Sequence, residues 1–239
     1  MPPKAASVFL KFVLAGAKVC YEILNTTPRS DSRSWHILAD RRPDGAKKGH
    51  AMNLKEVDAF AWSSLVAATT DSQSGFRFIN LCSVDAAGRP QARMVVLRRA
   101  DTAARLLEIH TDTRSPKWLE LSRNPFVTVL GFCASSRIQL RLVGAARLHA
   151  PGSDLAEKAW SELSVWTRNT YAGGPPGEEP DNNEPVPVTG EAGGKAYFGV
   201  VSFRADALDW FELRRASNRR AVFEYSDLGA LMAARWINP

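Results

Sequence analysis

The sequence of 239 residues has few cysteines, no long apolar run and no glycine-rich nucleotide motif. Its three cysteines, Cys20, Cys82 and Cys133, form no CxxC pair and no Cys/His ligand spacing. This argues against a metal site and a disulfide framework, and it favours a reducing compartment. No apolar stretch approaches the roughly 20 residues that a membrane helix needs, so we expect no membrane partner. The absence of GxGxxG and GxxxxGK[ST] sequences disfavours Rossmann and P-loop domains.

Positive charge is not concentrated on the folded part of the chain. The formal net charge is +6, but residues 1–52 hold nine basic and four acidic residues, which leaves only +1 for the remainder. A nucleic-acid-binding domain needs a basic surface on the domain itself. We therefore expect no nucleic-acid partner.

Residues 1–52 differ from the rest of the chain, because a short apolar segment with lysines leads into a turn-rich stretch without a sustained period. We interpret them as a basic leader or tail that is poorly ordered, or as an over-long start with the initiator at Met52. A transit peptide has a similar composition, so organellar targeting stays open beside a cytoplasmic location. The globular domain is expected at residues 53–239, and the Gly/Pro-rich stretch 172–194 is expected to be a long exposed loop within it.

Periodicity within this domain predicts mainly antiparallel strands. Helices are expected over residues 54–68, 116–123 and 153–166, the last with a capping box formed by Asp154 and Glu157. Strands are expected over residues 76–85, 91–99, 105–111, 126–133, 137–148, 195–204, 207–213 and 219–225. Gly88 is placed for a positive φ in a turn, and Gly144 for a β-bulge. Short connections imply antiparallel neighbours, and closure into a barrel would remove the sheet edges.

Basic and hydroxyl residues are concentrated in "RMVVLRRADTAARLLEIHTDTRSPK", residues 93–117. Arg93 and Arg98 should point to opposite faces of a strand, and whichever faces the core needs an anionic partner. Thr111 ends the neighbouring strand, and Ser115 and Lys117 come at the start of the following helix, where free N–H groups and the helix dipole favour an anion. The set is a candidate phosphate cradle.

Gln139 lies between apolar neighbours on a predicted strand and offers an amide donor and acceptor to a planar heterocycle. A phosphorylated ligand with a flat ring would suit this residue and the cradle together. An ordinary strand edge of solvated arginines, with a charged helix start, accounts for the same residues and remains the alternative.

Three motifs in order, "RMVVLR", "HTDTRSPK" and "RIQLRLVG", resemble the pyridoxamine 5′-phosphate oxidase family. The segments "LDWFEL", "NRRAVFEY" and "RWINP" resemble the closing strands of that family, so the resemblance covers roughly residues 55–239. It implies a mainly β fold, an antiparallel split β-barrel with two or three peripheral helices, and FMN as the cofactor. The expected cofactor-binding residues are Arg93, Met94, Val95, Val96, Leu97, Arg98, His110, Thr111, Ser115, Lys117, Gln139, Trp210 and Arg220.

The resemblance also assigns roles within this set. Lys117 matches a lysine that contacts the FMN phosphate, and Gln139 matches a glutamine that contacts the flavin. Trp210 and Arg220 match residues that reach the cofactor across a subunit interface, which implies a homodimer.

The substrate side of the family pattern is largely missing. Pro116 stands where the family commonly has a second basic residue, and residues 216–218 (Ala-Ser-Asn) replace an Arg-Leu-His motif. An ungapped count back from Trp166 puts Glu157 where an arginine holds the substrate's phosphate, while Ser161 is kept. The chain therefore resembles the oxidase-related FMN-binding branch more than the biosynthetic enzyme.

The function implied by the resemblance is that of an FMN-dependent oxidoreductase. A small-molecule substrate would transfer a hydride to flavin N5, and oxygen or another acceptor would reoxidise the flavin. No side chain stands out as a catalytic acid or base, although His110 lies near the expected site. The alternative is a split-barrel protein that binds flavin, haem or a deazaflavin without turnover.

Overall fold

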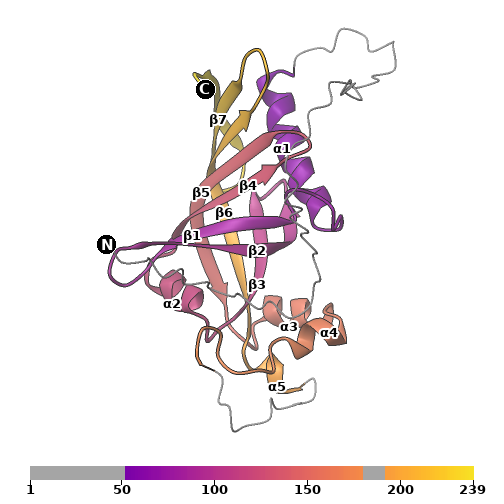
Figure 1. The fold of residues 1–239 in the computed structure, drawn as a ribbon, viewed down its shortest axis with the longest axis vertical. Coiled ribbons are helices and arrows are strands. Elements are labelled where there is room, and N and C mark those ends of the chain that lie inside the picture. Colours follow the sequence, from indigo (N-terminus) through magenta and orange to yellow (C-terminus); the bar gives the residue numbers. More distant parts are fainter. Residues whose placement is uncertain (1–51, 180–191) are drawn as a thin grey trace, which may run out of the picture. The chain divides into compact units, whose positions relative to one another are not determined.

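The computed structural model describes residues 52–179 and 192–239 (Figure 1). The predictions for residues 1–51, and for the middle of the 172–194 loop, lie outside the described residues. The strands of the described part are β1 (Phe78–Val84), β2 (Pro90–Asp101), β3 (Leu106–Asp112), β4 (Phe126–Cys133), β5 (Ile138–His149), β6 (Phe198–Glu212), β7 (Arg219–Tyr225) and β8 (Leu231–Ile237). Its helices are α1 (Leu54–Ala68), α2 (Pro116–Arg123), α3 (Asp154–Ser161), α4 (Val165–Asn169) and α5 (Ala192–Lys195).

The strands form one antiparallel sheet in the order β3-β2-β1-β4-β5-β6-β7-β8, and an additional pairing of β3 with β6 closes a barrel. The long strand β6 makes this closure possible. Its first half, Phe198 to Arg204, pairs with β3, while its second half, Ala207 to Glu212, leaves the barrel and pairs with β7. The mainly β split barrel is therefore confirmed. Figure 1 shows α1 and the β7–β8 hairpin toward one end, and α2, α3 and α4 toward the other.

Alternating apolar residues place one face of each barrel strand inside. On β5, Ile138, Leu140 and Leu142 are buried, whereas Gln139 and Arg141 lie on the outer face, as their alternation predicts. Burying an aliphatic side chain of this kind stabilises the fold by about 1.5–3 kcal/mol relative to leaving it exposed. The interior is therefore a packed core, and a ligand must bind on the outer face or at a barrel end.

A buried polar network holds α1 against β7. Asp58 accepts hydrogen bonds from Arg105 Nη2 at 2.8 Å and from the Tyr225 hydroxyl at 2.6 Å. The Tyr225 oxygen in turn accepts a hydrogen bond from Trp62 Nε1 at 3.0 Å. All four residues are buried, and a buried charge is tolerated only with partners of this kind.

Two predicted elements need correction. The helix expected over residues 153–166 is divided into α3 and α4, because Ser164 is extended and its hydroxyl accepts a hydrogen bond from the Thr167 N–H to begin α4. The expected capping box is also absent, since Ser153 is the N-cap of α3 and its side chain makes no capping bond. None of the helices in the described ranges has an apolar segment long enough to cross a membrane.

The strands expected over residues 195–204 and 207–213 are one continuous strand, β6, preceded by the short helix α5. The expected bulge at Gly144 is confirmed, because the register of β5 and β6 shifts between Val143 and Gly144. A Cβ at Gly144 would collide with the Arg204 carbonyl, so only glycine allows the two strands to approach there. Gly88 has the expected positive φ, 78°.

Candidate functional site

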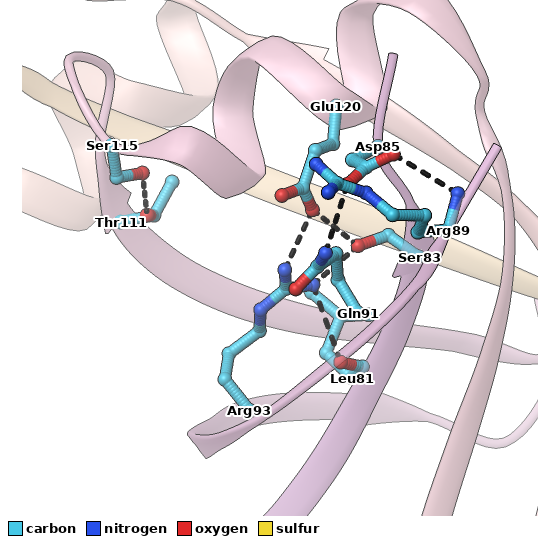
Figure 2. A network of polar contacts seen from close by, with 9 residues as sticks. All are labelled: Leu81, Ser83, Asp85, Arg89, Gln91, Arg93, Thr111, Ser115 and Glu120. Carbon is cyan, nitrogen blue, oxygen red and sulfur yellow. Dashed lines mark hydrogen bonds and ion pairs between the residues drawn. The ribbon is translucent and has the colours of Figure 1, made fainter. Parts of the chain in front are cut away.

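Arg93 lies at the end of the barrel interior, on the same side of β2 as the buried Val95 and Leu97. Its guanidinium donates hydrogen bonds to the Ser83 hydroxyl and to Glu120 Oε2 of α2, the second at 2.6 Å (Figure 2). Glu120 is 9% exposed. It supplies the anionic partner that an inward-facing arginine requires, so the charge of Arg93 is already balanced within the chain.

Thr111, Ser115 and Lys117 gather where β3 leads into α2. Thr111 Oγ1 and Ser115 Oγ lie 3.3 Å apart, and both residues are buried (Figure 2). Ser115 is the N-cap of α2, but its hydroxyl donates to the Asp112 carbonyl at 2.6 Å and does not cap the helix. The half-buried Lys117 has no hydrogen bond or ion pair within the described residues, and burial and then the charge of Arg93 lower its pKa. The carboxylates of Asp112 and Glu120 raise this pKa but form no ion pair with Lys117, and an ammonium group without an ion-pair partner at a helix N-terminus suits a phosphate.

A β-bulge turns two consecutive arginines of β2 to the outer face. The register pairs Leu97 with Ile109 inside the barrel and then pairs Arg99 with Glu108, so Arg98 is the extra residue. Arg98 is half-buried, and burial lowers its pKa. Among the described residues, no carboxylate lies within ion-pair distance of it.

Tyr171 lies close to Arg98 and comes from the segment after α4. Burial raises the pKa of Tyr171 to about 12, and the charge of Arg98 acts in the opposite direction. Arg114 holds this segment in place, because its Nη2 donates hydrogen bonds to the carbonyls of Tyr171 at 3.3 Å and Gly173 at 2.9 Å. As predicted, Arg98 points to the opposite face of β2 from Arg93.

His110 has one ring nitrogen without a partner. Its ring packs edge-on against Phe198, with the ring centroids 5.1 Å apart. Nε2 lies 3.3 Å from Glu108 Oε1, whereas Nδ1 is buried and has no hydrogen-bond partner in the described part of the chain. Buried polar atoms are nearly always paired, so a bound group is a natural partner for Nδ1.

The register of β5, β6 and β7 separates the remaining predicted residues into two faces. Gln139 and Arg220 lie directly opposite the same residue, Phe211, so all three share the outer face. Trp210 lies on the other side of β6, where it is fully buried and its Nε1 has no partner among the described residues. Within one chain, therefore, Trp210 offers a ligand no surface.

Asp209 links two arginines next to Gln139. Arg220 donates to Asp209 at 2.9 and 2.7 Å, and Arg141 donates at 2.9 Å. Burial raises the pKa of Asp209, but the hydrogen bonds and charges of Arg220 and Arg141 outweigh it and hold the pKa below its ordinary value of 3.8. The three side chains together carry one net positive charge on the outer face.

Gln139 and the segment after α2 contact different parts of β5. The Ala146 N–H donates to the Pro125 carbonyl, just after α2, at 2.8 Å. Gln139 is further along the same strand by a distance of roughly 23 Å, at ~3.3 Å per residue. Gln139 therefore lies far along β5 from the segment that follows α2.

An apolar band covers the outer face between the two sets. The register places Met94 and Val96 of β2 on this face, while Val95 and Leu97 point into the barrel. Exposed apolar side chains of neighbouring strands continue the band, namely Phe78, Phe126, Phe132 and Val143. Exposed apolar surfaces of this kind are typical of interaction sites.

Comparison with known proteins identifies the domain. Residues 59–150 match the family model of the pyridoxamine 5′-phosphate oxidase FMN-binding domain. The chain is similar to the pyridoxamine 5′-phosphate oxidase-like family. Pyridoxine/pyridoxamine 5′-phosphate oxidase 2 of Arabidopsis thaliana is 26% identical over 175 residues, which cover 68% of this chain and 87% of the relative.

Solved structures of related proteins have the same fold. A pyridoxamine 5′-phosphate oxidase-related, FMN-binding protein from Nostoc punctiforme is 24% identical with a TM-score of 0.60, over 75% of this chain and 96% of the other. PhzG from Burkholderia lata, crystallised with tetrahydrophenazine-1-carboxylic acid, is 17% identical with a TM-score of 0.54, over 78% of this chain and 90% of the other. At these identities the likeness concerns the fold alone.

FMN is the cofactor of this oxidase-like domain. The residues present fit such a group, because within the described residues Lys117 is a half-buried cation without an ion-pair partner and His110 has a buried nitrogen without a hydrogen-bond partner. The hydroxyls of Thr111 and Ser115 lie beside Lys117 in sequence and add polar atoms of the kind that contact phosphate oxygens.

The departures from the oxidase-like pattern have visible structural counterparts. Glu157 of α3 forms an ion pair with Lys195 of α5 at 2.6 Å, so its charge is partly balanced. Pro116 is exposed at the first position of α2, where a proline removes no helical hydrogen bond. Residues 216–218 lie in the turn between β6 and β7.

Sequence reasoning missed several residues that shape the site. Glu120 and Ser83 accept hydrogen bonds from Arg93, and Asp209 forms an ion pair with Arg220. Tyr171 lies close to Arg98. The alternation of β2 gives a signal for an acidic partner to Arg93, since it places that arginine on the buried side. It does not show which acid lies there.

Proposed function

We propose that this chain is an FMN-dependent oxidoreductase whose cofactor phosphate binds at Lys117. The observation that carries this proposal is a half-buried lysine at the start of α2, with no hydrogen-bonding or ion-pair partner among the described residues. A phosphate dianion would offset both causes of its lowered pKa, the burial and the nearby Arg93 charge. Glu120 already neutralises Arg93, so Lys117 rather than Arg93 supplies the attraction.

The flavin portion would extend along the outer face of β2 and β3. Arg98 and Tyr171 flank this region, and His110 Nδ1 supplies a hydrogen-bonding atom that has no other partner in the described chain. The bound flavin supplies hydride-accepting chemistry, and the protein orients it and tunes its electronics. This role requires no catalytic acid or base from the chain.

The proposal includes a homodimer in which each cofactor contacts both subunits. Gln139 lies roughly 23 Å along β5 from Ala146, which contacts the segment after α2, and Arg220 lies in the same cross-strand row as Gln139. We infer that these two residues reach the cofactor held at Lys117 of the other subunit. A second copy packed on the apolar band would bring its own outer face toward β2. Met94, exposed by 67%, and Phe126, exposed by 68%, would be covered by such packing.

The test of this function begins with the purified full chain, loaded with FMN. Bound FMN should give the visible absorbance of an oxidised flavin. Anaerobic addition of candidate amines, alcohols and reduced nicotinamides should bleach it in at least one case. Steady oxygen or acceptor consumption would then establish turnover. Bleaching without turnover would point to a flavin carrier, and a protein that takes up no FMN would refute the proposal.

Pyridoxamine 5′-phosphate should be a poor substrate. Glu157 stands where the family pattern has an arginine for the substrate's phosphate, and a carboxylate repels that dianion even when Lys195 is close. The expected rate is far below that of the preferred substrate. Brisk oxidation of pyridoxamine 5′-phosphate by the FMN-loaded protein would show that Glu157 does not lie at the phosphate position.

A further inference from the structure

A cleft of about 540 Å³ opens on the outer face of β3, β6 and β5, where Leu155 of α3 contributes to its lining. The floor follows the strand register. Arg147 of β5, Ser202 of β6 and Glu108 of β3 lie opposite one another in one row. None of the residues in this row is among the expected cofactor-binding residues.

Two of the three arginines that line the cleft have no ion-pair partner among the described residues. Arg99 and Arg147 are exposed, and neither has an ion-pair partner among the described residues. Arg204 also lines the cleft, but its guanidinium forms ion pairs with Asp206 at 3.3 Å and with Asp227 at 3.2 Å. Two guanidinium groups are therefore left for a ligand, and guanidinium groups bind carboxylates with two parallel hydrogen bonds.

The acidic groups of the cleft are engaged elsewhere. Glu108 Oε1 lies 3.3 Å from His110 Nε2. Asp101 Oδ1 accepts hydrogen bonds from the N–H groups of Ala103 and Ala104, each at 2.9 Å. Glu108 is the cross-strand neighbour of Arg99, but among the described residues neither carboxylate forms an ion pair with Arg99 or Arg147.

His149 and Ser202 add neutral polar groups. His149 Nε2 lies 2.8 Å from Ser202 Oγ. Burial and then the charge of Arg147 lower the pKa of His149 from its ordinary value of 6.5, so the imidazole is neutral at pH 7. Leu106, Ala145 and Leu155 supply the apolar part of the lining.

From the two unpaired arginines and the apolar walls, we propose that this cleft binds a small organic acid, with its carboxylate at Arg147 and Arg99 and its hydrocarbon body against Leu106 and Leu155. The site is separate from the Lys117 phosphate site and does not depend on the proposed flavin chemistry. The connection between the two runs through Glu108, which lines the cleft and contacts His110.

The experiment is calorimetric titration of the full chain with benzoate, with benzamide as a neutral ligand of nearly the same shape. Wild type should bind benzoate saturably and benzamide much more weakly. Arg147→Gln should weaken benzoate binding by roughly tenfold or more, as expected for loss of a charge-assisted bond. Arg99→Gln is a second variant of the same kind, and Arg123→Gln, at the exposed end of α2, is the matched control.

A further variant separates the two anion sites. Lys117→Ala should leave benzoate binding unchanged while FMN affinity, measured separately, falls. The proposal is overturned if wild type shows no saturable binding, or if both Arg147→Gln and Arg99→Gln bind as tightly as Arg123→Gln. It is also overturned if Lys117→Ala weakens benzoate binding as much as Arg147→Gln does. A protein that binds benzoate in this pattern but takes up no FMN would refute the flavin proposal and leave the cleft proposal standing.

Discussion

Replacing Lys117 by alanine tests the phosphate site most directly. The ammonium group is half-buried, and no carboxylate among the described residues lies within ion-pair distance, so its removal breaks no ion pair in that part of the chain. A charge-assisted hydrogen bond to a phosphate contributes about 1.5–3 kcal/mol, which corresponds to a roughly 10- to 150-fold loss of FMN affinity. Partial exposure to water screens the charge, so we expect a value toward the lower end of this range.

The assay is quenching of flavin fluorescence on titration with the protein, performed with FMN and with riboflavin. Riboflavin lacks the phosphate, so Lys117→Ala should leave its affinity nearly unchanged. Lys55→Ala, at an exposed position in α1, is the matched control for loss of a lysine. Equal losses of FMN and riboflavin affinity would refute the phosphate contact, and so would an unchanged FMN affinity.

Four other perturbations have outcomes that the structure predicts. FMN affinity should fall as the pH rises through the pKa of Lys117, which lies below the ordinary 10.5, because phosphate binding needs the protonated amine; titrations in alkaline buffers measure this, and Lys117→Ala should lack the effect. Asp58→Ala should lower the free energy of unfolding by about 3–5 kcal/mol, since it leaves Arg105 buried without its partner; urea denaturation checks this against Glu162→Ala at an exposed site. Asp209 has a lowered pKa, so its stabilising contribution is present above the unfolded-state pKa and is lost as the pH falls through the folded-state pKa; Asp209→Asn should lack this acid-dependent loss in thermal melts. Met94→Lys should convert the proposed dimer to a monomer in sedimentation experiments, whereas a monomeric wild type would contradict the shared site.

Local sequence patterns predicted most of the barrel. Strict alternation on β5 and the glycine at its bulge identified that strand and its inner face, because both signals depend on neighbouring residues only. The continuity of β6 was missed, since Ala205 and Asp206 resemble a connection in the sequence. In the structure, this is where β6 changes partner from β3 to β7, and only the tertiary arrangement fixes it.

The candidate site was only partly predictable for the same reason. The orientation of Arg93 followed from alternation, but its partner Glu120 lies 27 residues further along the chain and on a helix. The sequence also could not show that Trp210 and Arg220 lie on opposite faces of the sheet, because the register of β6 and β7 decides this. The motif resemblance named these residues together, and the structure assigns them to different surroundings.

The extra residue in β2, Arg98, allows this strand to present two neighbouring arginines on its outer face. In strict alternation, either Arg98 or Arg99 would point into the barrel, where a guanidinium without an acid would be very unfavourable. The irregularity at this point directs Arg98 toward Tyr171 and Arg99 toward the cleft beside Glu108. Deleting a single residue here would turn one of the two arginines into the barrel, so the proposed cofactor site and the proposed cleft both depend on this irregularity.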